Sequence, residues 1–144
     1  MYVAFDPGKT TGIASFEDDG SDRSKSVYTG DNLYVVLALL EKFHASNPIK
    51  HFIVEDFKLR EDKVYDLVGQ EGHADRAIGA IEYVAWQLKV PITFQSSSIL
   101  KTALKWARIK PRAGHLPDEL SAYAHGVHWL IVNNIRRNPV LDED

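Results

Sequence analysis

The stretch YVAFDPGKTTGIASF, residues 2–16, decides the fold. Residues 2–5 are an apolar run of strand-favouring side chains, the Pro7-Gly8 pair interrupts it, and residues 12–16 resume the apolar pattern. This arrangement predicts a β-hairpin. Asp6 ends the first strand beside the turn, where an aspartate serves either as a metal ligand or as a cap of the turn through its side chain.

The Gly8-Lys9-Thr10 run also resembles the end of a nucleotide-binding phosphate loop. That loop requires a glycine, four further residues and then Gly-Lys-Ser/Thr. The position that the first glycine would occupy is Val3. The spacing therefore excludes the phosphate loop, and Asp6 remains the residue of interest in this turn.

The composition of the chain describes an ordinary globular protein. Its 144 residues suit a single domain spanning 1–144, with an acidic tail at about 138–144 that we expect to fray. The chain has no cysteine, which excludes disulfides and thiolate metal sites. We expect a cytoplasmic protein without a signal peptide or a membrane span. Because the net charge is −3, a role with nucleic acid requires a local basic face.

The remaining pattern predicts alternating strands and helices. A loop at 17–26 precedes a third strand at Val27-Tyr28, and Asp31 caps a helix over 32–45. A strand at 51–56, a helix at 71–89, a strand at 90–94 and a helix behind the serines at 96–98 follow. The last helix begins near Pro117. Three strands followed by helix–strand alternation predict an α/β fold, a five-stranded mixed sheet with helices on both faces.

Four polar residues stand at the predicted ends of these elements: Asp6, Glu55, His115 and Asp118. Carboxylates clustered at one sheet edge are what hard divalent cations need for phosphodiester hydrolysis, and an imidazole can bind the metal or orient the attacking water. Taken singly, each has a simpler interpretation: a solvated strand end for Glu55, a favourable charge at a helix N-terminus for Asp118, and an exposed loop residue for His115. Glu55 and Asp56 point to opposite faces of their strand, so only one of them can join Asp6.

Three segments in this order resemble the RuvC family of Holliday junction resolvases, within the ribonuclease H-like superfamily. FDPGKTTGIASF resembles the first motif of the family, and FIVEDF resembles the second, whose glutamate corresponds to Glu55 and not to Asp56. GHLPDELSAYAHG resembles the last motif, in which two metal ligands three residues apart correspond to His115 and Asp118. VPITFQSSSILKTALK resembles the strand, serine-rich turn and lysine-bearing helix before it.

The resemblance implies an endonuclease that cleaves Holliday junctions and other branched DNA. It implies catalysis and metal binding by Asp6, Glu55, His115 and Asp118, with two Mg²⁺ ions that Mn²⁺ can replace. It also implies a homodimer, for which the helix at 71–89 with Gly79 and Ala80 is the candidate interface. The short, acidic chain is similar in style to bacteriophage members, acting in the cytoplasm of a bacterial or phage-infected cell. A ribonuclease of the same fold and a non-catalytic scaffold that binds nucleic acid remain the alternatives.

The chain departs from the family at three places. The helix after Asp118 reads Glu-Leu-Ser-Ala where the family usually has Asp-Ala-Leu-Ala or a similar sequence. The stretch between Lys105 and His115 is short, and Phe57 follows Glu55 earlier than the aromatic residue that helps to open the junction in the family; Tyr65 is the other candidate for that role. The segment LKTALKWARIKPRAG carries five basic residues and no acid, which is either a phosphate track or a solvated helix face. The expected DNA-binding residues are Lys9, Phe57, Lys58, Lys101, Lys105, Arg108, Lys110 and Arg112.

Overall fold

The computed structural model describes residues 1–56 and 64–142 of the chain. Its centre is a five-stranded mixed sheet in the order β3-β2-β1-β4-β5. The strands are β1 (Tyr2–Asp6), β2 (Thr10–Phe16), β3 (Asp22–Thr29), β4 (His51–Asp56) and β5 (Ile92–Ser96). The first three strands pair antiparallel, whereas β4 pairs parallel with both β1 and β5. The predicted fold class is therefore confirmed.

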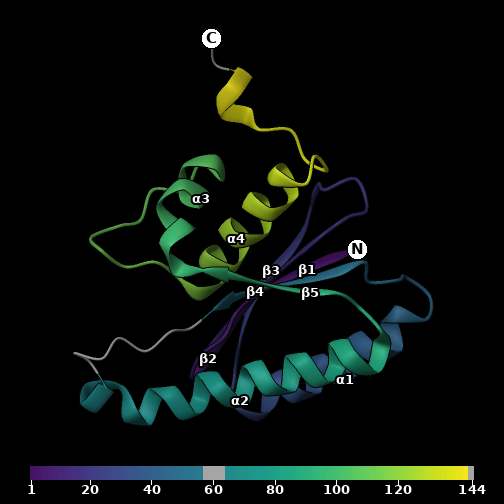
Figure 1. Ribbon diagram of the computed structural model, residues 1–144, viewed down its shortest axis with the longest axis vertical. Helices are drawn as coiled ribbons and strands as arrows, with labels where there is room; N and C mark the ends of the chain where they lie inside the picture. The colour runs from purple at the N-terminus through teal and green to yellow at the C-terminus, as the bar shows by residue number, and fades with distance from the viewer. Residues whose placement is uncertain (57–63, 143–144) are drawn as a thin grey trace.

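Two layers of helices cover the sheet, as Figure 1 shows. The helices α1 (Asp31–His44) and α2 (Val64–Leu88) lie on one face, and α3 (Leu100–Trp106) and α4 (Asp118–Val132) lie on the other. The short 3-10 helices η2 (Ser97–Ile99) and η3 (Pro139–Asp142) precede α3 and end the described chain. No helix among the described residues is long and apolar enough to span a membrane.

The alternation of side chains along β1 and β4 determines which face each residue meets. Val3 and Phe5 on β1 pack with α1 and α2, together with Phe52 and Val54 on β4. The intervening residues Tyr2, Ala4 and Ile53 pack with α4 instead. By the same alternation, the side chains of Asp6 and Glu55 lie on the α4 face of the sheet, and that of Asp56 lies on the opposite face.

Two glycines allow α4 to lie directly on the sheet. A Cβ atom at Gly12 on β2 would overlap the backbone carbonyl of Asp118, the first residue of α4. A Cβ atom at Gly126 would overlap the ring of the fully buried Phe16. These contacts hold the N-terminus of α4 against β2, next to the edge of the sheet where β1 ends.

Several predicted boundaries were wrong. Strand β3 includes 22–26, which the sequence predicted as loop, because its mainly exposed polar residues pair with β2 at the edge of the sheet. Helix α2 begins seven residues before the predicted start, and β5 lies two residues later than predicted. Gly30 and not Asp31 occupies the N-cap of α1. Residues 139–142 form the short η3, and fraying of the tail stays a prediction.

Candidate active site

The structure brings three of the four predicted site residues together: Asp6, Glu55 and Asp118. Because β1 and β4 are parallel neighbours with Phe5 opposite Val54, the next residues, Asp6 and Glu55, lie side by side at the C-terminal ends of these strands. Both side chains interact directly, and the charge of Asp118 also acts on Asp6. The register selects Glu55 over Asp56, as the sequence resemblance predicted.

Asp118 is held in place by β2. The Thr10 hydroxyl donates a hydrogen bond to the Asp118 carboxylate across 108 residues of sequence, and the absent side chain of Gly12 lets the α4 backbone approach. The DPGKTTG turn thus performs two tasks. It places Asp6 at the strand end, and it anchors the carboxylate that arrives from the far end of the chain.

Ser121 and His125 complete the surroundings of Glu55, and the sequence analysis did not predict either. The Ser121 hydroxyl donates to Glu55 Oε2 at 3.2 Å, and His125 Nε2 lies 3.7 Å from Glu55 Oε1. Residues 118, 121 and 125 follow the i, i+3, i+7 spacing of one helix face. That spacing was visible in the sequence, although the sequence analysis assigned no role to either residue.

His125 is the most unusual residue of this group. It is completely buried, and neither ring nitrogen has a hydrogen-bond partner among the described residues. A buried polar group without a partner is destabilising by about 1–3 kcal/mol. Such a cost is typical of a functional site rather than of a packing position.

Crowding of the carboxylates changes their ionisation. Burial, reinforced by a hydrogen bond and like charge from Glu55 and by the charge of Asp118, raises the pKa of Asp6 from 3.8 to about 9. Burial opposes ionisation of Glu55 as well, but the adjacent His125 imidazole and hydrogen bonds from Asp6 and Ser121 lower its pKa to about 2. At neutral pH the pair therefore shares one proton, which resides on Asp6 while Glu55 is ionised.

The donor set suits a hard divalent cation, because it consists of carboxylate oxygens with a hydroxyl nearby. In the described residues no three His, Cys, Asp or Glu side chains are already arranged to hold a metal ion. Instead, Glu55 accepts from Ser121 and Asp118 accepts from Thr10. A bound cation would compete with the proton on Asp6 for these carboxylate oxygens.

His115 makes different contacts from those of the three carboxylates. It is exposed in the turn before α4, where its backbone N–H donates to the Arg112 carbonyl. No contact within 1–56 and 64–142 joins its imidazole to Asp6, Glu55 or Asp118. A role for His115 as a metal ligand or water-orienting base remains a prediction.

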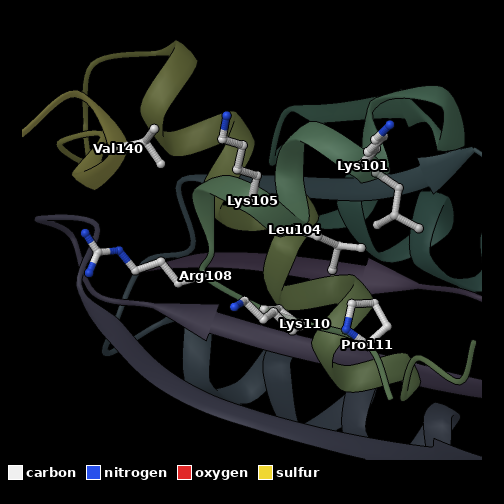
Figure 2. A pocket seen from close by; sticks show the side chains of 9 residues that line it. Lys101, Leu104, Lys105, Arg108, Lys110, Pro111 and Val140 are labelled. Atoms are coloured by element: carbon white, nitrogen blue, oxygen red, sulfur yellow. The ribbon is translucent and has the colours of Figure 1, made fainter. Parts of the chain in front are cut away.

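The predicted basic face is only partly continuous. Helix α3 ends at Trp106, and Arg108 has a positive φ of 57°, so the chain turns and Arg112 does not continue the helical stripe. A groove of about 900 Å³ lies beside α3. Its lining includes Lys101, Lys105, Arg108 and Lys110 together with apolar side chains such as Leu104 and Val140 (Figure 2). The Arg108 guanidinium donates to the Pro139 carbonyl on η3 at 3.4 Å. The basic face is therefore a rim around an apolar groove.

The structure describes only some of the other predicted DNA-binding residues. Lys9 is exposed in the β1–β2 turn. Phe57 and Lys58 lie outside the described residues, as does the side chain of Tyr65.

The fold is similar to that of solved RuvC structures. The chain superposes on RuvC from Thermus thermophilus in complex with a Holliday junction substrate with a TM-score of 0.55 and 18% identity, covering 92% of this chain and 95% of RuvC. A second Thermus thermophilus RuvC structure gives a TM-score of 0.51, 17% identity and the same coverages. No family model and no curated protein matches the sequence. The chain thus has the RuvC type of ribonuclease H-like fold over nearly its whole length, which confirms the fold that the sequence resemblance implied.

Proposed function

We propose that the protein is a metal-dependent, structure-selective endodeoxyribonuclease that cleaves four-way DNA junctions and other branched DNA. The observation that carries this proposal is the group of Asp6, Glu55 and Asp118, which β1, β4 and the start of α4 bring together. Support comes from the RuvC type of fold, since the Thermus protein is described in complex with a Holliday junction substrate.

The residues of the site have separable roles in this proposal. Asp6, Glu55 and Asp118, with His115 as a further candidate, would hold up to two Mg²⁺ ions, or Mn²⁺ in their place. Bound there, such a metal would activate water and stabilise the leaving oxygen of the phosphodiester. Ser121 and His125 orient Glu55 and keep it ionised, and Thr10 orients Asp118. Burial and the neighbouring carboxylates raise the pKa of Asp6 in the metal-free site, and a cation held there would favour the ionised form of Asp6.

The working unit in this proposal is a homodimer formed through the outer face of α2. Gly79 lies on that face, and a Cβ atom there would have no protein atom within 4 Å, which permits close approach of a second helix. Tyr83 and Trp86 lie beside it, 59% and 75% exposed, with ring centroids 6.1 Å apart. Symmetric incision of two opposed strands needs two sites related by a two-fold axis, and an exposed aromatic face is typical of an interaction surface.

The experiment that tests the function is a panel of labelled substrates incubated with and without Mg²⁺: four-way junctions, flaps, forks, linear duplex and a structured RNA. Symmetric, Mg²⁺-dependent incision of the junction is the expected result. Cleavage of the RNA alone would identify a ribonuclease of the same fold. Tight junction binding without turnover under any metal would identify a non-catalytic scaffold.

A further inference from the structure

A second polar depression lies beside the carboxylates, on the α1 and α2 side of the sheet. Two cavities of about 190 and 410 Å³ share the residues Lys9, Gly30, Asp31 and His73. We name the combined depression the Lys9 groove. It is formed by the β1–β2 turn, the β3–α1 turn and α2, three segments far apart in the sequence.

The Lys9 groove carries three basic side chains. Lys9 comes from the turn, while His73 and Arg76 lie at i and i+3 on α2 and line the same cavity. All three are exposed, and none forms an ion pair with an acid in the described parts of the chain. Asp31 is the one carboxylate among the lining residues, so the groove keeps a net positive charge.

A hydroxyl group lies at the floor of the groove. Thr11 is 1% exposed and lines the smaller cavity. Among the side-chain hydrogen bonds of the described residues, none involves Thr11. Its neighbour Thr10 donates to Asp118 instead. A threonine that lines a cavity with basic side chains has a hydroxyl that can donate to an oxyanion.

The groove and the carboxylates are adjacent through Thr10. This residue lines the larger cavity and hydrogen-bonds to Asp118. If one phosphate of a nucleic-acid strand lies at the carboxylates, the neighbouring phosphates of that strand can therefore lie over the β1–β2 turn. Arginine and lysine with a hydroxyl donor match a phosphate better than a neutral or cationic ligand.

We infer that the Lys9 groove binds a backbone phosphate of the DNA strand that is cut at Asp6, Glu55 and Asp118, one or a few nucleotides from the scissile bond. This inference rests on the proposed function and adds a substrate contact to it. It makes Arg76, His73 and Thr11 binding residues, and it gives Lys9 a defined part in the DNA contact that the sequence analysis predicted for it.

The first test uses the metal-free protein and two probes. In ¹H–¹⁵N NMR spectra, a short single-stranded DNA oligonucleotide should shift the amides of Thr11, Gly30 and His73, and Arg76→Ala should weaken this response several-fold. Inorganic phosphate should shift the same amides at much higher concentration. Saturation by inorganic phosphate with no response to the oligonucleotide would show a free-anion site and overturn the inference.

The second test measures how junction binding depends on salt. Arg76→Ala should reduce the slope of log K against log salt by about one, and Thr11→Val should weaken binding without changing the slope. Lys42→Ala, an exposed lysine in the last turn of α1, is the charge-matched control and should match the wild type. Light scattering should show that all variants keep the wild-type mass.

The two tests separate failure of the groove from failure of the function. If the wild type cleaves junctions, but Arg76→Ala keeps the wild-type slope and the oligonucleotide leaves the groove amides unshifted, the inference is wrong and the proposed function stands. If the wild type binds no branched DNA, the proposed function fails, and the inference that rests on it fails with it.

Discussion

Replacing Asp6 by asparagine should stabilise the metal-free protein at neutral pH. In the folded chain the pKa of Asp6 is raised from 3.8 to about 9, so folding favours the protonated form. The contribution of this group to stability is complete below pH 4 and is lost as the pH rises towards 9. Asparagine keeps a similar shape without the charge.

The size of the effect follows from the gap between the two pKa values. At pH 7 the solution pH lies about three units above the unfolded value, which corresponds to at most about 4 kcal/mol at ~1.4 kcal/mol per unit. Relaxation of the site and entry of water reduce this figure, and a gain of about 1–4 kcal/mol is the expected range. Asp6→Asn and the wild type should converge near pH 4.

The assay is urea unfolding of both proteins in EDTA between pH 4 and 8. Asp22→Asn is the control of opposite sign, because Asp22 accepts hydrogen bonds from Tyr123 and Arg136. Although partial burial opposes it, these partners lower the pKa of Asp22, so its contribution is present above pH 4 and lost as the pH falls. A destabilised Asp6→Asn at pH 8, or a gain independent of pH, would refute the crowding of the carboxylates.

Four further predictions follow from the packing and charge of the protein. His125→Leu should lower single-turnover cleavage with unchanged junction affinity, because Glu55 loses the imidazole that lies 3.7 Å from its Oε1; wild-type cleavage by this variant would exclude His125 as a positioning residue for Glu55. Gly12→Ala should destabilise the fold by about 3 kcal/mol or more in thermal unfolding, because its Cβ overlaps the start of α4, and a near-neutral result would contradict the contact. Lys101→Ala with Lys105→Ala should reduce the salt slope of junction binding by about two, and an unchanged slope would exclude α3 as a phosphate track. Trp86→Glu should give monomers in light scattering, whereas a persistent dimer would place the interface elsewhere than the α2 face.

The sequence was sufficient for the elements that depend on local pattern. The hairpin around Pro7-Gly8, the apolar strand before Glu55 and the position of Asp118 at a helix start all follow from periodicity and turn chemistry. These determine where the three carboxylates lie along the chain. The parallel pairing of β1 with β4 then brings Asp6 and Glu55 together.

Contacts between distant segments could not be predicted in the same way. Strand β3 carries few apolar side chains, since it lies at the edge of the sheet, and its strand character comes from pairing with β2. The partnership of Thr10 with Asp118 spans most of the chain. The role of His125 depends on Glu55, which lies on β4. The sequence did contain one signal for it, because Asp118, Ser121 and His125 share one face of α4.

Single-turnover cleavage of a synthetic four-way junction in Mg²⁺ tests the central claim most directly, with Asp6→Asn, Glu55→Gln, Asp118→Asn and Asp56→Asn compared with the wild type. Loss of about 3–5 kcal/mol of transition-state stabilisation should slow the first three variants by roughly 10²–10⁴. They should keep their fold and most of their junction affinity. Asp56→Asn, on the opposite face of β4, should cleave at nearly the wild-type rate. Full-rate cleavage by Asp6→Asn would contradict the account, because Asp6 would then only cap the turn that follows β1.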